Sequence, residues 1–212
     1  MHARGLRRDR AFVSRPRVIV VGASAGGVEA LQTLAGGLPR NLRAAIFMVL
    51  HTRTEDGGHL ADILSRNGNM AAANALNGSP VTPGRIYVAR PNLHLTLRSD
   101  RMWLTRGPTV NLHRPAVDPL FQSAAQAYGS RVIGVLLTGY QDDGTAGLAA
   151  IKNCGGIAVV QDPNEAYAPD MPRNALRHVE VDHCLPLKEI APLLVDLVEG
   201  RQRKSGKGRN CK

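Results

Sequence analysis

The feature that most constrains this chain of 212 residues is a short apolar run that meets a glycine-rich turn. Residues 17–21 read RVIVV, and a continuous β-branched run of this kind is typical of a strand buried on both faces of a parallel sheet. The sequence GASAGG follows directly, and beyond it apolar residues recur at helical spacing until Gly36 and Gly37. The chain is therefore predicted to open its domain with a strand, a tight turn and a helix.

The same alternation of strand and helix continues along the chain. Further buried strands are predicted at 44–50, 131–139 and 157–161. A helix capped by Asp56 is predicted to end at Asn67 and Gly68, and a second, over 118–128, is predicted to have Asp118 as its cap. Further helices are predicted at 145–154, 169–178 and 187–199. Between residues 79 and 105, RIYVAR, LHLTLR and RMWLT are predicted to form an inserted antiparallel hairpin or meander, in which His94 points to water. The predicted fold class is α/β: a doubly wound, mostly parallel sheet with helices on both faces and an inserted antiparallel hairpin.

The net charge of +10 comes from the two ends of the chain. Residues 1–17 and 201–212 together hold 12 basic residues and one acidic residue, while the segment between them holds 15 basic and 16 acidic residues. Residues 1–16 and 200–212 are predicted to be disordered basic tails, and 17–199 a single catalytic domain. A nearly neutral domain with 4% aromatic residues favours no specific binding of nucleic acid.

Several other classes of protein are disfavoured by simple features. No apolar run approaches the roughly 20 residues that span a bilayer, and no apolar segment follows the basic start as in a secretory signal. The cytoplasm is therefore the expected location. The three cysteines are odd in number and far apart, which argues against a disulfide framework and against a zinc site.

Three of the apolar strands end on residues that carry chemistry. The first ends at Ser24, the second ends at His51, and the third leads to Asp142 and Asp143. Because ligands of open α/β sheets bind beyond the carboxyl ends of the strands, these side chains are expected at one edge. A nucleophile, a base and a carboxylate are thereby predicted to meet there.

The turn around Ser24 has two interpretations. Its G-x-S-x-G pattern between a strand and a helix is the context of a nucleophile elbow, where glycines permit a sharp turn and the helix N-terminus favours an oxyanion. Glycine-rich turns of this kind also bind phosphate groups. A dinucleotide site, however, expects an acidic residue after the second strand, where this chain has His51. The histidine favours a serine hydrolase, and a nucleotide- or phosphate-binding protein is the alternative.

The carboxylate partner has to come from one of two neighbours. Asp142 and Asp143 precede a predicted helix, so one of them is expected to cap that helix while the other faces the cleft. A neutral His51 needs a carboxylate that holds its tautomer and stabilises its protonated form. The chain order Ser–His–Asp differs from the usual α/β-hydrolase order, so the geometry has to decide. Among the other histidines, His113 lies in a loop before a helix and is a candidate to line the cleft.

Several segments resemble, in order and at matching spacing, the catalytic domain of the chemotaxis protein-glutamate methylesterase (CheB) family. They are GASAGGVEAL, the strand that ends in His51, RIYVARPNLHL, HRPAVDPLFQSAA, LLTGYQDDGTAGL and MPRNAL, within residues 18–198. The resemblance implies Ser24 as the nucleophile, His51 as the base and Asp143 as the carboxylate that orients it. It also implies oxyanion donors at Ala25 and near Tyr140, with no metal and no cofactor.

The same resemblance implies a substrate and partners. The family hydrolyses methylated glutamate side chains on cytoplasmic helices of chemoreceptors, releasing methanol, and many members also deamidate glutamine there. The expected partner is a methylated chemoreceptor or another signalling protein, with a separate receiver-domain protein as a candidate regulator. Membrane contact is expected only through the receptor or through weak electrostatics of the basic tails. A catalytically inactive adaptor with this fold is the other alternative, against which the intact Ser24, His51 and Asp143 argue.

The sequence departs from the family pattern at four positions near the site. Ala25, Thr52, Tyr140 and Gln141 stand where the family often has threonine, methionine, methionine and glycine. The methionine replaced by Tyr140 is associated with the oxyanion site, so this departure bears on that donor. The family's usual N-terminal receiver domain has no counterpart before the first strand, and we expect activity without such a cover.

Overall fold

The computed structural model describes residues 16–51 and 59–201, which form alternating strands and helices. The strands are β1 (Arg17–Ala23), β2 (Ala44–Leu50), β3 (Ala71–Asn74), β4 (Arg85–Val88), β5 (His94–Arg98), β6 (Arg101–Thr105), β7 (Val132–Leu136), β8 (Ile157–Gln161) and β9 (His183–Leu185). The helices are α1 (Gly27–Gly36), α2 (Leu60–Asn67), α3 (Val117–Tyr128), α4 (Thr145–Asn153), α5 (Asp170–His178) and α6 (Leu187–Glu199).

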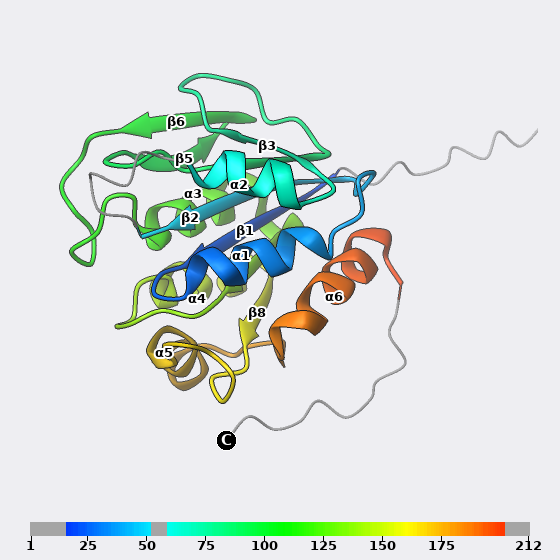
Figure 1. Cartoon of the computed structure of the whole chain (residues 1–212). Coiled ribbons are helices and arrows are strands. Elements are labelled where there is room, and N and C mark those ends of the chain that lie inside the picture. The colour runs from blue at the N-terminus through cyan, green and yellow to red at the C-terminus, as the bar shows by residue number, and fades with distance from the viewer. Residues whose placement is uncertain (1–15, 52–58, 202–212) are drawn as a thin grey trace, which may run out of the picture.

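Seven strands form one sheet in the order β3-β4-β2-β1-β7-β8-β9. Every neighbouring pair in this sheet is parallel, whereas β5 and β6 form a separate antiparallel pair. Figure 1 shows β1 and β2 running side by side toward the loop that begins α1. The predicted fold class, a mostly parallel sheet with an inserted hairpin, is confirmed.

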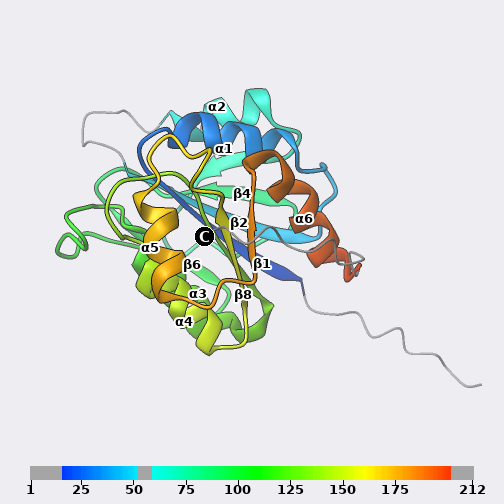
Figure 2. The same cartoon turned by 90° about the horizontal axis from the view of Figure 1, so that it is seen from below.

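Helices cover both faces of the sheet, which is why its central strands are apolar throughout β2 and β7 and from Val18 onward in β1. Along β1, Ile19 and Val21 belong to the core formed with α1, α2 and α6. Val18 and Val20 point the other way, into the core formed with α3, α4, α5 and the β5–β6 hairpin. Figure 2 shows the two layers, with α1, α2 and α6 on one side of the sheet and α3, α4 and α5 on the other.

One prediction about the strands was wrong, and two strands were missed. The segment RIYV is not part of the hairpin, because it joins the main sheet as β4, parallel to β2. The edge strands β3 and β9 were not predicted, since AAAN and HCL are too short to show a strand period. They form because the backbones of β4 and β8 each offer a free row of hydrogen-bonding groups.

Three predictions about individual polar residues were also wrong. His94 is buried instead of facing water: its Nε2 donates to the Pro108 carbonyl at 2.8 Å, and its Nδ1 accepts from the Ala116 N–H at 3.3 Å. Asp118 does not cap α3, which begins one residue earlier without a side-chain cap. Asp142 and Asp143 were expected to supply a cap for α4, but neither side chain does so. The N-cap of that helix is Gly144, in the left-handed conformation.

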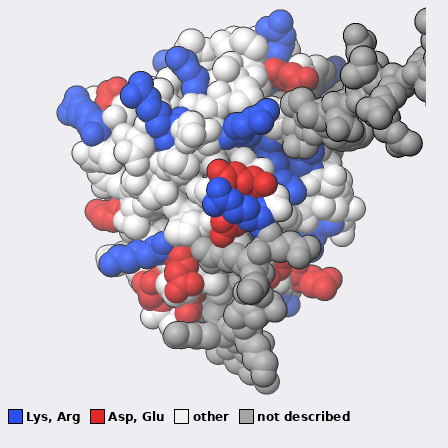
Figure 3. Space-filling view, turned by 90° about the vertical axis from the view of Figure 1, so that its right-hand side faces the viewer, with Lys and Arg blue, Asp and Glu red and all other residues white. Residues whose placement is uncertain are grey.

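Some predictions fall on residues outside the described part of the chain. These are the cap at Asp56, the departure at Thr52 and nearly all of both basic tails. Within the described ranges, no helix is long and apolar enough to cross a bilayer. On the face seen in Figure 3, outside the grey part, Lys and Arg side chains are interspersed with Asp and Glu.

Candidate active site

The candidate site lies where β1, β2 and β7 end. Ser24 follows β1, His51 follows β2, and Asp143 lies beyond β7 just before α4. The three loops are joined by backbone hydrogen bonds, from the His51 N–H to the Ala23 carbonyl (3.1 Å) and from the Ser24 N–H to the Thr138 carbonyl (2.9 Å). Because β2 and β7 lie on opposite sides of β1, the winding of the chain reverses here, and open α/β sheets bind ligands at such switch points. The structure brings the three predicted residues to this edge.

A tight turn presents Ser24 at the N-terminus of α1. Gly26 has a φ of 71°, in the left-handed region that favours glycine, and the Gly27 N–H donates to the Ser24 carbonyl at 2.8 Å. Gly139 packs so closely against the turn that a Cβ there would lie 2.7 Å from the Ser24 Cβ. The backbone and the Cβ of Ser24 therefore have a fixed position at a helix N-terminus, where N–H groups favour negative charge.

His51 and Asp143 form a buried pair. Nε2 of His51 lies 2.7 Å from Oδ2 of Asp143, and the two side chains are only 4% and 1% exposed. With Nε2 facing the carboxylate, Nδ1 is the ring nitrogen left for a second partner. Nδ1 is buried and has no hydrogen-bond partner among the described residues. A buried and unsatisfied polar atom is rare in a folded protein, and here it is placed to accept a proton.

The carboxylate of Asp143 sits on the N-terminus of α3. It accepts from the Val117 N–H at 2.6 Å and from the Asp118 N–H at 3.1 Å. Burial on its own raises the pKa of Asp143, but the hydrogen bonds from His51, Val117 and Asn111 outweigh it and hold the pKa below its usual value. Asp143 therefore stays ionised beside the imidazole. Of the two candidate aspartates, only this one reaches His51.

Asn111 is a site residue that the sequence analysis missed. Its Nδ2 donates to Oδ1 of Asp143 and to Oδ2 of Asp118, both at 2.9 Å. Oδ1 of Asp118 in turn accepts from the Gly147 N–H at 2.7 Å. Burial, and then the charge of Asp143, raise the pKa of Asp118. The side-chain amide of Asn111 thus bridges the buried carboxyl groups of Asp118 and Asp143. Asp143 in turn holds the candidate base, His51.

The backbone around Asn111 explains how its amide reaches inward. Val110 and His113 exchange two backbone hydrogen bonds, of 3.1 and 2.9 Å, across a two-residue turn. The turn residues Asn111 and Leu112 both have positive φ, 48° and 67°, as in a type I′ turn, where asparagine is favoured. The asparagine was a recognisable turn signal in the sequence. Nothing local indicated that its side chain would reach Asp143, which is 32 residues further along the chain.

His113, proposed from the sequence as a cleft residue, lies against the candidate base. Its ring stacks on the ring of His51 with a centroid distance of 3.6 Å and an interplanar angle of 11°. Burial, followed by the proximity of His51, lowers the pKa of His113 against a smaller opposite effect of Asp143. The neutral form of His113 is therefore the one that fits the stack.

The lowered pKa of His113 predicts how the stability of the protein changes as the pH falls. Since the folded pKa of His113 is below its unfolded value, the unfolded chain binds the proton first as the pH falls through about 6.5, and stability declines. We expect His113→Phe, which keeps an aromatic ring against His51, to lose less melting temperature than the parent between about pH 8 and about pH 5.5. Exposed His178 gives the control, His178→Gln, which should decline like the parent. Equal declines for the parent and His113→Phe would contradict this account.

The two predicted oxyanion donors lie in loops at the same edge. Ala25 follows Ser24 directly in the chain. Tyr140 follows Gly139, the glycine that packs closely against Ser24. Neither backbone N–H donates to another group within the described ranges. The side chain of Tyr140 is exposed. Exposed Asp142 forms no side-chain hydrogen bond with any described residue, and only its backbone carbonyl accepts, from the Thr145 N–H at 3.0 Å.

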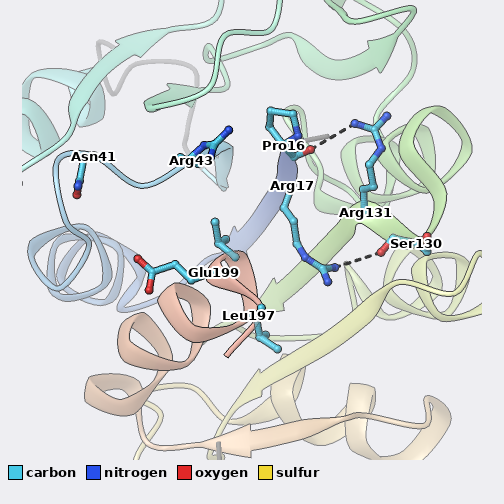
Figure 4. Close-up of a pocket in the computed structure, with 10 residues that line it drawn as sticks. Pro16, Arg17, Asn41, Arg43, Ser130, Arg131, Leu197 and Glu199 are labelled. Carbon is cyan, nitrogen blue, oxygen red and sulfur yellow. Dashed lines mark hydrogen bonds between the residues drawn. The ribbon is translucent and has the colours of Figure 1, made fainter. Parts of the chain in front are cut away.

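A separate hollow lies at the opposite edge of the sheet, around the start of β1 and the end of α6 (Figure 4). Three arginines line it, and two of them are tied to the backbone. Arg17 donates to the Ser130 carbonyl at 3.2 Å, and Arg131 donates to the Pro16 carbonyl at 3.3 Å. Figure 4 shows the guanidinium groups of Arg17, Arg43 and Arg131 well apart, without a common focus. No cluster of potential metal ligands is present among the residues described.

Comparison with known proteins identifies the family. The sequence profile of the CheB methylesterase family matches residues 19–194. The chain belongs to the CheB methylesterase family. Relatives named protein-glutamate methylesterase/protein-glutamine glutaminase include one from Anaeromyxobacter dehalogenans, 39% identical over 92% of this chain, and one from Ralstonia nicotianae, 37% identical over 85%. The chain spans 59% and 48% of the length of these two relatives.

Other matches extend over nearly the whole length of their proteins. A relative from Leptospira interrogans is 39% identical over 180 residues, which are 84% of this chain and 93% of the relative. The crystal structure of the Thermotoga maritima CheB methylesterase catalytic domain matches with a TM-score of 0.84 and 31% identity. That match covers 87% of this chain and all of the solved domain. The resemblance to the CheB catalytic domain is confirmed.

Proposed function

We propose that this chain is a serine hydrolase that demethylates glutamate methyl esters on a chemoreceptor or related signalling protein, and that it also deamidates glutamine there. The observation that carries the proposal is the buried His51–Asp143 pair at the same edge of the sheet as the half-buried turn of Ser24. Membership in the CheB methylesterase family and the names of the relatives support the same activity. The proposed place of action is the cytoplasmic part of the receptor.

The first half of the reaction acylates Ser24. Nδ1 of His51 takes the hydroxyl proton of Ser24 as its oxygen attacks the ester carbonyl. The N–H groups of Ala25 and Tyr140 hold the oxyanion, and one such donor contributes roughly 3–4 kcal/mol to the transition state. Asp143, whose low pKa keeps it ionised, stabilises the imidazolium through Nε2. His51 then returns the proton to the leaving oxygen, and methanol departs.

The second half of the reaction releases the product. Water takes the place of methanol, gives a proton to Nδ1 of His51 and attacks the acyl carbon. The tetrahedral intermediate collapses, Ser24 recovers its proton, and the substrate is left with a free glutamate carboxylate. With glutamine the same steps apply, and ammonia leaves in place of methanol.

The direct test is methanol release from a methylated chemoreceptor fragment by the purified chain. We expect turnover by the parent and only background release by a variant without the Ser24 hydroxyl. A phosphate-binding protein would release no methanol and would be stabilised in a thermal-shift assay by nucleotides. An inactive adaptor would bind the fragment without releasing methanol.

A variant at Asn111 tests how the carboxylate is held. Because the left-handed φ of 48° suits glycine, Asn111→Gly removes the amide without straining the turn. Loss of a hydrogen bond to a charged group costs about 1.5–3 kcal/mol, so we expect kcat to fall about tenfold to a hundredfold. Without the amide, the carboxyl groups of Asp118 and Asp143 repel each other directly. The pKa of Asp143 should rise, and the acid limb of the pH–rate profile should move to higher pH.

The control for this variant is Ser99→Gly in the turn between β5 and β6. Ser99 also has a positive φ, 50°, and lies outside the hydrogen-bond network of Asp143. Ser99→Gly should keep both the parent rate and the parent pH profile. If Asn111→Gly lowered kcat without moving the acid limb, its amide would not act through the charge of Asp143.

A further inference from the structure

Exposed apolar side chains gather around the candidate site. The described part of the chain has five large hydrophobic side chains that are exposed, and three of them stand in loops at the catalytic edge. These three are Leu112 (80% exposed), Tyr140 (56%) and Tyr167 (76%). The other two, Leu76 and Trp103, lie beside β3 and in β6. We call the three residues at the catalytic edge the apolar rim.

Leu112 stands directly between two residues of the site. Its neighbour Asn111 donates to Asp143, and its other neighbour His113 stacks on His51. The paired hydrogen bonds between Val110 and His113 close the turn beneath it. Leu112 is therefore held in place while its side chain projects into solvent.

The two tyrosines are placed with similar rigidity. The ring of Tyr167 lies against Gly26 so closely that a Cβ at Gly26 would be 3.0 Å from the Tyr167 Cγ. The neighbour of Tyr167, Ala168, donates from its N–H to the Thr138 hydroxyl at 2.8 Å. The Ala168 carbonyl accepts from the N–H of Gly139, the residue before Tyr140, at 2.9 Å. One short network thus links both tyrosines to the Ser24 turn.

The stability of the fold does not explain why a leucine occupies position 112. Its φ of 67° lies in the left-handed region, where a type I′ turn favours glycine and where leucine is strained. Its exposed apolar surface also gains nothing from the core. A strained residue held rigidly and exposed beside a reactive centre is typical of a binding role.

We propose that the apolar rim is a docking surface for the segment of the protein substrate that carries the ester, and that it binds apolar side chains flanking the modified glutamate. This inference rests on the proposed function. Each rim residue is at most one position from a residue packed on His51 or on the Ser24 turn, so a protein segment that brings its ester carbonyl to Ser24 lies beside all three loops. Leu112 is then a specificity residue of the enzyme.

The test compares Leu112→Gly with the parent on three substrates. They are a small glutamate methyl ester, a peptide methyl ester flanked by leucine and alanine, and the same peptide with serine in place of those flanking residues. Burying a leucine side chain is worth about tenfold or more in affinity, so kcat/KM on the apolar peptide should fall by about that factor. On the serine peptide and on the small ester it should stay within about twofold, the signature of a coupled pair in a double-mutant cycle.

Further variants separate docking from folding. Glycine suits the turn better than leucine, so the melting temperature of Leu112→Gly should equal or exceed that of the parent while activity on the apolar peptide falls. Leu112→Met should retain much of that activity. Leu76→Ala, at an exposed leucine away from the site, should match the parent on every substrate.

Three outcomes would overturn the docking role. Equal kcat/KM for the parent and Leu112→Gly on the apolar peptide would show that Leu112 makes no useful contact. The same loss on all three substrates would show that Leu112 only supports Asn111 and His113. A parent enzyme with equal kcat/KM on both peptides would show that the rim does not read apolar flanks. Failure of the proposed function itself would look different, because the parent would then hydrolyse none of the three esters.

Discussion

Replacing Ser24 by alanine is expected to abolish methanol release. Removal of the nucleophile from a serine triad costs about 10⁴–10⁶-fold in kcat, since only oxyanion donors and substrate binding then remain. The fold should survive, because the backbone hydrogen bonds of Ser24 to Thr138 and Gly27 do not involve its side chain. Alanine also keeps the Cβ that packs against Gly139. The measurement is methanol release at saturating ester, together with the melting temperature of both proteins.

A serine at the opposite end of the sheet provides the control for this change. The carbonyl of Ser130 accepts from Arg17, and the residue lies at the edge away from the site. Ser130→Ala should therefore keep the parent rate. Hydrolysis by Ser24→Ala at the parent rate would refute the assignment of the nucleophile, whatever the fate of the control.

The second large effect is expected at Asp143. Its two oxygens accept four hydrogen bonds, from His51, Asn111 and the N–H groups of Val117 and Asp118. An asparagine offers one oxygen and one NH₂ group, so Asp143→Asn places donor against donor and no longer fixes the tautomer of His51. We expect kcat to fall by about 10⁴-fold. Each buried donor left unsatisfied costs about 1–3 kcal/mol, so the melting temperature should fall as well.

Asp142→Asn is the matched comparison for this variant. The side chain of Asp142 is exposed and forms no hydrogen bond with any described residue, so rate and stability should both stay close to those of the parent. All rates should be measured well below the melting temperature of Asp143→Asn, which separates lost chemistry from lost fold. A larger loss of kcat for Asp142→Asn than for Asp143→Asn would reverse the assignment of the carboxylate.

The parts of the fold that the sequence predicted are those with strong local patterns. Continuous apolar runs marked β1, β2 and β7, and parallel strands necessarily bring their carboxyl ends to one edge. That reasoning predicted Ser24 and His51 at one edge together with either Asp142 or Asp143, and the resemblance to the CheB family singled out Asp143. It failed for β4, because a short apolar strand shows its period but not its partner, and the partner decided between hairpin and main sheet.

The parts that could not be predicted depend on contacts between distant segments. Asp118 and Asp142 both precede or begin helices, where a carboxylate usually caps, yet one is used in a buried network and the other faces solvent. Asn111 looked like a turn residue and is one, but its amide also bridges two carboxyl groups. Local sequence sets the backbone of such residues, while tertiary packing sets the partner of the side chain.

Two residues close to the ends of the described chain lie at the same edge of the sheet, which has a practical consequence for handling the enzyme. Pro16 and Gly200 both line the hollow at the edge where β1 begins, whereas Ser24 follows the other end of that strand. Seven residues of extended strand span about 20 Å. A surface, bead or fluorophore joined next to either residue is therefore attached on the far side of the domain from the reacting serine. Immobilisation there should leave the catalytic edge open to a substrate as large as a receptor fragment.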